Sequence, residues 1–549
     1  MAIKKQDGGK AIYFGVDLGS DSLKISYVVF DKDKNEEQIY PLRYPDGRDS
    51  IPGYGYYDEN TDGWYFGAEM FTGELGKFDT IVEIKKQIRL IDQEVEENGK
   101  AVRIYDHSHE FRKYGEDIHR SVRREYKPTF QARRDTPQTV VEKFFTYVYN
   151  ERLLPMAKMI HEGQGIPFSG KCKCVFTYPA GVSDRYKNEY RRVVEKAGFE
   201  VLRLVPEASM AGLYAFRYFA ELNSKRALVV DVGETRYTAS VINFWSGIEV
   251  KKELPVWEMG GLDYDRALGD YVRETAGVGE ELSSLRKFFF NQELKNAKEL
   301  VLSNRRGVAV AYVGEATAEV YITRDQFKEI TTEARMKIAQ RVAEDVKSTS
   351  SEYVVLTGGC MDSYGLREGI QTALRENGMG SVRVISSQEK MHKGRFLVSL
   401  GAAICACGKY KTQLISQLSY GLIAMQESIG RNIFSVMLKA GTKLPVEATA
   451  TFYTVGSAST SSYLKVYASN CHDEKFLRGE KILDDKHPSL RKLLVGDLKY
   501  SHPVPETHPL HVTISVDADG VGRVRAYSYE KNSTKKIAEY TSEQFDMER

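Results

Sequence analysis

The sequence predicts an α/β part followed by an all-β part. With 549 residues the chain exceeds what one hydrophobic core usually serves, so two or more domains are expected. From about residue 11 to 408, strand patterns alternate with helical ones, which is typical of α/β folds. From about residue 414 to 535, short alternating strands separated by turn residues indicate a β-sandwich. The segment 410–418 between the two parts is the expected linker.

Two segments of the α/β part share an apolar run, a D-x-G turn and a second apolar run. The first, AIYFGVDLGSDSLKISYVVF, covers residues 11–30, and the second, ALVVDVGETRYTASVINF, covers residues 227–244. Each pattern predicts a hairpin whose tip carries one carboxylate, Asp17 in the first and Asp231 in the second. Main-chain N–H groups at such a tip can point into a phosphate while the aspartate holds magnesium, directly or through water. The pair therefore predicts one shared phosphate-bearing ligand, with two ordinary hairpins as the alternative.

A third segment, VVLTGGCMD at residues 354–362, predicts a strand that ends in Gly358 and Gly359 and allows a close backbone approach. Phosphoryl transfer depends mainly on positioning and on neutralising developing charge. Two facing acidic tips, a metal ion and one lysine are enough for that chemistry.

Composition excludes several other classes of function. The formal net charge of +2, from 78 basic and 76 acidic residues, gives no general attraction to nucleic acid or to a membrane surface. The N-terminus lacks the apolar core of a signal peptide, and no segment approaches the roughly 20 apolar residues of a membrane span. A cytoplasmic location is therefore expected. The charged stretch near residues 94–135 is interpreted as a solvated insertion, with nucleic-acid or metal binding as the alternative.

The six cysteines fit a reducing compartment better than a disulfide framework. Four of them form two C-x-C pairs, Cys172 with Cys174 and Cys405 with Cys407. The first pair lies in a strand pattern and the second in a helical one, so the two pairs would present their thiols differently. Buried structural thiols are the favoured interpretation, and a zinc site is the alternative.

Taken in chain order, the motifs resemble the seventy-kilodalton heat-shock chaperone family, the DnaK-like proteins. They are FGVDLGSDS, EIKKQIRL, the stretch from VFTYPAGVSD to LVPEASMAGLYAF, VVDVGETRYTAS, EMGGLDYDRAL, LKNAKELVLS and VVLTGGCMD. The β-rich part, with LSYGLIAMQESIGRNIFSVMLKA and HVTISVDADGVGRVRA, is similar to that family's peptide-binding sandwich. The resemblance implies an actin-like, ribonuclease-H-like two-lobed ATPase domain over residues 1–409 and a β-sandwich substrate-binding domain over residues 419–549. The family's helical lid over the peptide cleft is not expected within the residues after the β-rich part, either because the chain is truncated or because the protein binds its clients without a lid.

The resemblance implies roles for individual residues. Asp17 and Asp231 would hold magnesium through water, Glu207 would lie near the metal, and Lys85 would lie near the γ-phosphate and the attacking water. Lys85, Glu207 and Asp231 are the implied catalytic residues. The implied nucleotide-binding residues are Asp17, Gly19, Ser20, Gly233, Thr235, Gly260, Gly261, Lys298, Gly358 and Gly359. The implied peptide-binding residues are Leu422, Met425, Phe452 and Leu464, for which ordinary sandwich core is the alternative.

Several positions depart from the family pattern. Asp21 stands in the first phosphate motif where the family has a small hydroxyl residue, and its charge near a γ-phosphate would be unfavourable unless it points away or meets magnesium. In the second phosphate motif the family's run of glycines and a threonine is here Gly233, Glu234, Thr235 and Arg236, so close backbone approach is partly lost. Glu299 and Asp362 replace arginines that stack on adenine in some members, and Lys187 replaces a relay arginine. Nucleotide binding is still expected, whereas hydrolysis and coupling between the domains are open.

The expected function is that of an ATP-dependent chaperone that binds ATP or ADP with Mg²⁺ and hydrolyses ATP slowly. Its expected partners are unfolded or extended peptides, a J-domain protein and a nucleotide-exchange factor. The alternative is a regulatory or co-chaperone protein of the same fold with little hydrolysis. A small-molecule kinase and a filament-forming actin relative are further possibilities on fold alone.

Overall fold

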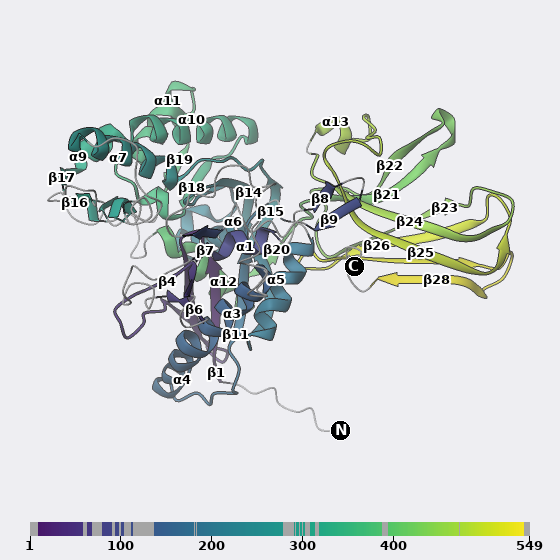
Figure 1. The fold of residues 1–549 in the computed structure, drawn as a ribbon, viewed down its shortest axis with the longest axis horizontal. Helices are drawn as coiled ribbons and strands as arrows, with labels where there is room; N and C mark the ends of the chain where they lie inside the picture. The colour runs from purple at the N-terminus through teal and green to yellow at the C-terminus, as the bar shows by residue number, and fades with distance from the viewer. Residues whose placement is uncertain are drawn as a thin grey trace. The chain divides into compact units, whose positions relative to one another are not determined.

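The chain is described by a computed structural model (Figure 1). The residues that it describes are 9–58, 63–67, 80–90, 94–97, 100–103, 111–113, 137–180, 182, 184–277, 290, 293–295, 297–298, 300–301, 308–312, 318–386, 394–471 and 473–542.

The chain forms two compact units. The second unit consists of residues 413–549 together with two short pieces, 181–188 and 250–253, and the first unit contains the remainder. The first is mixed α/β and the second is β-rich, as the sequence predicts. The boundary at residue 413 falls inside the expected linker.

Two large sheets form the centre of the first unit, and their strands follow the same order. The first sheet runs β12-β11-β1-β2-β3 with β4 paired to β2, and the second runs β19-β18-β13-β14-β15-β20. The strands of the first sheet are β1 (Lys10–Leu18), β2 (Ser22–Asp31), β3 (Glu36–Pro41), β4 (Ile51–Pro52), β11 (Lys173–Tyr178) and β12 (Glu200–Pro206). Those of the second are β13 (Lys225–Val232), β14 (Tyr237–Trp245), β15 (Gly247–Glu253), β18 (Tyr353–Thr357), β19 (Arg383–Ile385) and β20 (Lys411–Gln413).

Each sheet has an antiparallel hairpin next to a parallel strand. The hairpin β1-β2 lies beside parallel β11, and the hairpin β13-β14 lies beside parallel β18. Asp17 and Asp231 are each the last residue but one of the first strand of their hairpin. The two predicted D-x-G turns therefore occupy equivalent places in two equivalent sheets.

Two buried helices, α6 (Glu207–Tyr218) and α12 (Leu397–Ala406), pack against each other at the centre of the unit (Figure 1). Their contact depends on Gly401, because a Cβ atom added there would overlap the carbonyl oxygen of Met210. Backbone on both sides leaves no flexible side-chain end that could move away.

We expect Gly401→Ala to destabilise the first unit by about 1–3 kcal/mol, the usual cost of overpacking a core. All three tryptophans, Trp64, Trp245 and Trp257, belong to this unit, so their fluorescence reports its unfolding in urea. Gly163→Ala is the matched control, since a Cβ there meets nothing within 4 Å. If both variants had the same urea midpoint of unfolding, the close contact of Gly401 with Met210 would be contradicted.

Shorter elements complete the first unit. Its other strands are β5 (Tyr54–Asp58), β6 (Gly63–Phe66), β7 (Thr80–Glu83), β8 (Glu94–Glu97), β9 (Lys100–Arg103), β10 (Phe111–Lys113), β16 (Val308–Tyr312) and β17 (Ala318–Ile322). Its other helices include α1 (Ile84–Leu90), α3 (Pro137–Tyr147), α4 (Leu154–Gly163), α7 (Gly261–Ala276), α9 (Arg324–Ile330), α10 (Thr332–Thr349) and α11 (Leu366–Glu376). Helix α5 (Asp184–Lys196) begins in the piece 181–188 assigned to the second unit and continues into residues of the first. Of the predicted insertion 94–135, only β8, β9 and β10 fall within the described residues.

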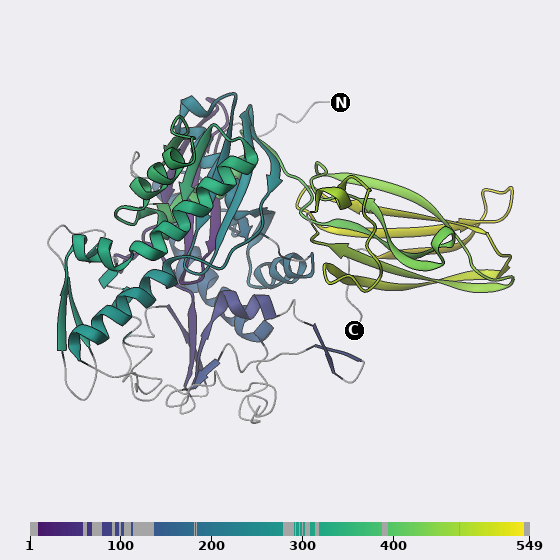
Figure 2. The same cartoon turned by 90° about the horizontal axis from the view of Figure 1, so that it is seen from above.

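The second unit contains two four-stranded antiparallel sheets (Figure 2). Their orders are β22-β21-β24-β25 and β23-β26-β27-β28. The strands are β21 (Ser419–Gln426), β22 (Arg431–Leu438), β23 (Val446–Tyr453), β24 (Ser459–Ser469), β25 (Leu490–Val504), β26 (Pro509–Val516), β27 (Gly522–Tyr529) and β28 (Lys536–Ser542), with the short helix α13 (Glu474–Leu477) before β25. Alternate residues are buried along β27, as expected for strands with one face on a core.

No helix among the described residues is both long enough and apolar enough to cross a membrane.

Candidate functional site

The tip of the first hairpin holds a buried carboxylate. Asp17 is only 7% exposed, and its Oδ1 accepts a hydrogen bond of 3.0 Å from Thr177 Oγ1 on the neighbouring strand β11. Burial raises the pKa of Asp17 above its usual value; the Lys24 and Lys85 ammonium groups oppose this shift, and the Glu207 carboxylate adds to it. A nearby cation would therefore stabilise the charged form of this carboxyl group.

Lys85 and Glu207 form a buried ion pair beside that carboxylate. Lys85 Nζ donates to Glu207 Oε1 over 2.8 Å, and the two side chains are 9% and 10% exposed. Lys85 lies in the first turn of α1, and Glu207 opens α6 directly after Pro206. The helix N-terminus favours a carboxylate at that position.

The tip of the second hairpin carries a second carboxyl group with a raised pKa. The pKa of Asp231 is raised to about 7, first by burial and then by the carboxylates of Glu207 and Asp17, while Lys85 and Lys24 act in the opposite direction. Glu207 raises the pKa of both Asp17 and Asp231, and Asp17 also raises that of Asp231, although the three carboxyl groups come from three different elements. Together with Lys85, they are the acidic and basic residues that the resemblance assigns to magnesium and catalysis; those roles stay predictions.

The donor set suits magnesium held through water. Mg²⁺ prefers oxygen ligands and usually keeps several waters when one or two carboxylates bind it. No group of three His, Cys, Asp or Glu side chains in the described part of the chain is placed to hold a metal ion directly. Asp17 and Asp231 would hold the ion through its waters, and the ion would stabilise the charged form of both buried carboxyl groups.

Close backbone approaches shape the surroundings of the second tip. A Cβ added to Gly260 would lie 2.5 Å from the carbonyl oxygen of Gly233, and one added to Gly358 would lie 2.6 Å from Oδ1 of Asp231. Gly358 also has φ +93°, which disfavours any other residue. By contrast, a Cβ on Gly359 would meet nothing within 4 Å, so space is open there.

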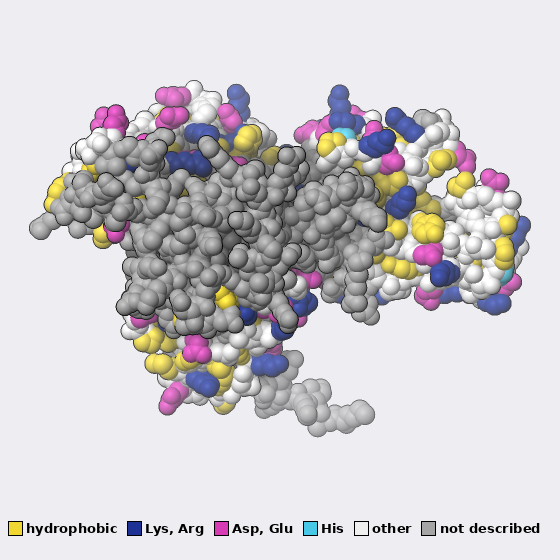
Figure 3. Space-filling view, viewed as in Figure 1, with side chains coloured by type: hydrophobic (Ala, Val, Ile, Leu, Met, Phe, Trp, Pro, Cys, Tyr) yellow, Lys and Arg dark blue, Asp and Glu magenta, His cyan; other side chains and the backbone are white. Residues whose placement is uncertain are grey.

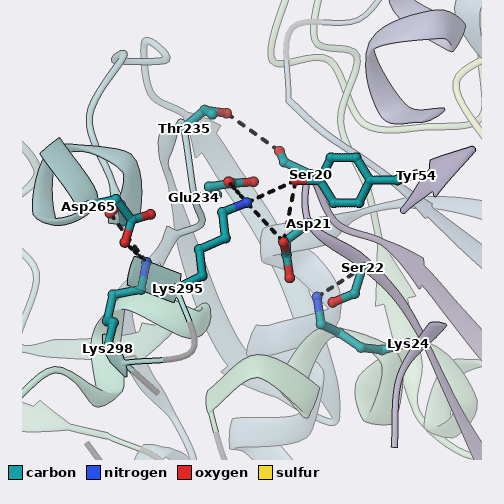
Figure 4. Close-up of polar contacts among 11 residues, drawn as sticks. Ser20, Asp21, Ser22, Lys24, Tyr54, Glu234, Thr235, Asp265, Lys295 and Lys298 are labelled. Atoms are coloured by element: carbon teal, nitrogen blue, oxygen red, sulfur yellow. Dashed lines mark hydrogen bonds and ion pairs between the residues drawn. The ribbon is translucent and has the colours of Figure 1, made fainter. Parts of the chain in front are cut away.

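The two tips meet through polar side chains (Figure 4). Ser20 Oγ of the first tip lies 3.5 Å from Thr235 Oγ1 of the second. Lys295 Nζ lies 3.0 Å from Asp21 Oδ1 and 2.6 Å from Glu234 Oε1, and it donates to the Tyr54 hydroxyl over 2.9 Å. The two residues that depart from the family pattern in the phosphate motifs therefore share one ammonium group.

Asp21 and Glu234 both contact the Lys295 ammonium, yet their pKa values are shifted in opposite directions. Burial alone would raise the pKa of Asp21, but the ammonium groups of Lys295, Lys24 and Lys298 together lower it below its usual value. For Glu234 burial dominates over Lys295, and the pKa is raised. Burial would lower the pKa of Lys295, yet Tyr54, Asp21 and Glu234 raise it, so this side chain stays charged.

Lys298 contacts the start of α7 rather than the tips. Its Nζ lies 2.5 Å from Asp265 Oδ1 and 3.5 Å from the carbonyl oxygen of Gly261 (Figure 4). Gly19 lies in the first tip, where a Cβ would come within 2.8 Å of Lys24 Nζ. The predicted nucleotide-binding residues are thus gathered around the tips, α7 and the end of β18.

Sequence reasoning missed Lys295, Tyr54 and Thr177. The only signal for Lys295 was its spacing from Lys298, because residues three apart share one helical face. Tyr54 and Thr177 belong to no recognisable sequence motif, and only the tertiary structure brings them close to the tips.

The four predicted peptide-binding residues do not share one environment. Leu422 on β21 and Leu464 on β24 are 5% and 1% exposed and belong to the core, whereas Met425 is 57% exposed. Phe452 is half-buried on β23, in the other sheet. Their role in peptide binding stays a prediction.

The remaining predictions concern residues outside the tips. The pairs Cys172 with Cys174 and Cys405 with Cys407 are free thiols, and all but Cys407 are buried. Lys187 is buried in α5. Glu299 and the side chain of Asp362 lie outside the described residues.

One comparison with known proteins identifies the family. The family model described as Hsp70 protein matches residues 168–549, well over half of the chain. The match covers Glu207, the second D-x-G hairpin, the start of α7, the end of β18 and the whole β-rich unit. Hsp70 proteins are chaperones whose family binds ATP and ADP with Mg²⁺. This chain therefore belongs to the Hsp70 family.

Proposed function

We propose that the chain is an ATP-dependent chaperone whose first unit is an actin-like domain that binds ATP with Mg²⁺ at the two hairpin tips. The observation that supports this most is the buried ion pair of Lys85 with Glu207, two residues whose charges act on the buried carboxyl groups of both hairpin tips. A nucleotide bound with magnesium would supply a cation for the buried Asp17 and Asp231, whose pKa values are raised, together with phosphates for the tips. The equivalent strand order of the two sheets is what a two-lobed domain of this kind requires.

Hydrolysis would depend on the same residues. Bound magnesium would neutralise part of the negative charge of the phosphates. Glu207 accepts a hydrogen bond from Lys85 and so fixes the direction of the lysine side chain. Lys85 would stabilise the charge that develops on the phosphoryl group, while the carboxylates of Asp17, Asp231 and Glu207 orient water. Because the lysine is already engaged by Glu207, slow turnover is expected.

A regulatory or co-chaperone function with little hydrolysis is the second candidate. It is favoured by one observation, the pairing of Lys295 with Asp21 and Glu234 at the tips. These carboxylates would lie where hydrolysis needs neutral donors close to the terminal phosphate. Nucleotide binding without turnover would then regulate the β-rich unit or a partner chaperone.

The second unit would bind extended apolar peptides through strand-like main-chain hydrogen bonds. Exposed apolar side chains on this unit support the proposal; they are Met425, Tyr453, Val455, Tyr463 and Ile482. Apolar side chains lie among charged ones on the face of this unit seen in Figure 3. A J-domain protein and an exchange factor are the partners that the family suggests.

Calorimetric titration with ATP at saturating Mg²⁺ tests the nucleotide site. We expect Asp17→Asn to weaken binding by at least about tenfold, because the amide cannot carry the negative charge that attracts magnesium. The amide oxygen still accepts from Thr177 Oγ1, so the fold should be kept. Glu352→Gln, which alters an exposed ion pair with Lys225, is the control.

Single-turnover hydrolysis on the same samples separates the two candidates. Measurable turnover that Lys85→Met abolishes supports the chaperone ATPase, whereas tight binding without turnover supports the regulatory protein. Wild-type protein that does not bind ATP would overturn both.

A further inference from the structure

One sheet of the β-rich unit has an outer face that carries aromatic and basic side chains. The sheet runs β23-β26-β27-β28, so β26 and β27 are its two inner strands. Alternate residues of β27 are buried, and the residues between them face the other way; they are Arg523, Arg525, Tyr527 and Tyr529. Two arginines and two tyrosines therefore follow one another along the solvent side of an inner strand.

Aromatic rings from both inner strands meet at one end of this face. The ring centroids of Tyr527 and Tyr529 lie 5.3 Å apart, and the His511 ring on β26 lies 5.4 Å from the first and 6.2 Å from the second. His511 and Tyr527 are direct partners in the strand register. All three residues are only partly buried. The Tyr527 and Tyr529 rings are inclined at 67° to each other, so this aromatic cluster offers two separate ring surfaces.

Positive charge accompanies the aromatic cluster. Residues 523–536, which form β27, the turn after it and the first residue of β28, include five basic residues and one acidic residue. Lys536 Nζ lies 5.7 Å from the centre of the Tyr527 ring. Arg525 is exposed and has no ion-pair partner among the described residues. A ligand with negative charges along its length is therefore favoured over a neutral one.

The acidic residues of this face are paired or lie away from the rings. Glu539 forms an ion pair of 2.6 Å with Lys536, and Asp517 lies 3.8 Å from Arg523. The glutamate of β23 is near the start of that strand, away from the rings. Beside the tyrosines, the guanidinium of Arg525 therefore stays available to a phosphate.

We propose that this face binds single-stranded nucleic acid, with bases stacked on the aromatic cluster and the phosphate backbone held beside Arg525. Every base has a π-face, so stacking on aromatic side chains tolerates different sequences. A four-stranded sheet that carries its stacking rings on the inner strands is one of the common ways in which proteins hold unpaired bases. The face shares no residue with the hairpin tips, so the inference does not depend on the proposed nucleotide site.

The same geometry selects against a duplex. Bases in a duplex are stacked on one another and cannot lie on protein side chains without being unpaired. The whole chain has a net charge of only +2, so its general attraction to a duplex backbone is small. Binding should therefore depend on unpaired bases as well as on charge.

The test is fluorescence anisotropy of the full chain with three labelled probes, at low salt and pH 7.5. The probes are oligouridylate, oligothymidylate and a DNA duplex of the same length. We expect at least one single strand to bind more tightly than the duplex, and the tighter strand identifies RNA or DNA as the ligand. The double variant Tyr527→Ala with Tyr529→Ala should weaken binding of that strand at least about tenfold, as expected when one or two bases lose their stacking partners.

Two further measurements separate charge from stacking. Arg525→Gln should reduce the slope of log affinity against log salt by about 0.7, the value for one phosphate contact on a single strand. Inorganic polyphosphate, which has the charge but no bases, should displace the labelled strand less well than an unlabelled strand does. Tyr321→Ala removes an exposed tyrosine of β17 in the first unit and is the control that should leave binding unchanged.

Several outcomes would overturn this inference. They are wild-type protein that binds neither single strand, a duplex that binds as tightly, polyphosphate that competes as well as the strand, and a tyrosine double variant that binds like Tyr321→Ala. Cross-strand aromatic pairs also stabilise a sheet, so folding of the double variant is checked by far-UV circular dichroism. If that variant does not fold, Arg525→Gln decides, because a smaller salt slope supports the inference and an unchanged slope contradicts it.

Discussion

Lys85→Met should lower the free energy of unfolding of the first unit by about 3–5 kcal/mol, the usual result of removing one partner from a buried ion pair. The ammonium pairs with Glu207 over 2.8 Å, and both side chains are at least nine-tenths buried. Its removal leaves the Glu207 carboxylate without that cation beside Asp17 and Asp231, whose pKa values it already raises. Urea unfolding followed by tryptophan fluorescence measures the loss, since all three tryptophans lie in this unit.

Two controls show whether the loss comes from the uncompensated carboxylate. Lys225→Met removes the cation of an exposed pair with Glu352 and should change stability by no more than about 0.5 kcal/mol. The double variant Lys85→Met with Glu207→Gln should recover much of the loss, because no buried charge is then left unpaired. A double variant as unstable as Lys85→Met would mean that lost packing, rather than charge, causes the effect.

The sequence was sufficient to predict the hairpins because their signal is local. An apolar run, a D-x-G turn and a second apolar run specify strand, turn and strand without reference to the rest of the chain. The change to short alternating strands after residue 414 was local in the same way, and the second unit is built of two antiparallel sheets. The equivalent strand order of the two sheets in the first unit could not be read from the pattern, because parallel pairing of β11 and β18 joins segments far apart in the chain.

The chemistry at the tips was less accessible to sequence reasoning. The sequence predicts that the charge of Asp21 is unfavourable near a phosphate unless the side chain points away or meets magnesium. The structure gives it a third arrangement, a salt bridge with Lys295, which lies 274 residues further along the chain. In the sequence, Glu234 indicates only that a glycine of the motif is lost. In the structure, Glu234 forms a salt bridge with the same Lys295 ammonium. A substitution that seems to weaken a motif can therefore belong to a set of charges that only tertiary structure brings together.

Asp231→Asn should stabilise the first unit in the absence of nucleotide and divalent metal, and the gain should grow with pH. The folded pKa of Asp231 is raised to about 7, from a usual value of 3.8, by burial and by the nearby Glu207 and Asp17. Between these two values the folded chain holds a proton that the unfolded chain has released, so raising the pH destabilises the folded state. The stability that protonation provides is complete near pH 4 and is lost by about pH 8. At pH 8 the gain from the neutral amide should be on the order of 4 kcal/mol, given about 1.4 kcal/mol for each pKa unit.

Urea unfolding in EDTA at pH 5, 6, 7 and 8 checks this expectation, with Glu352→Gln as a control whose difference from wild type should stay flat. A gain that is equal at all four pH values would mean that Asp231 is not protonated in the folded chain. The same carboxylate is one of the two expected to hold magnesium, so the variant that is more stable without ligand should also gain less from adding ATP and Mg²⁺. Carboxylates placed close together cost stability until a cation binds, and that cost would make the stability of the folded unit depend on the proposed ligand.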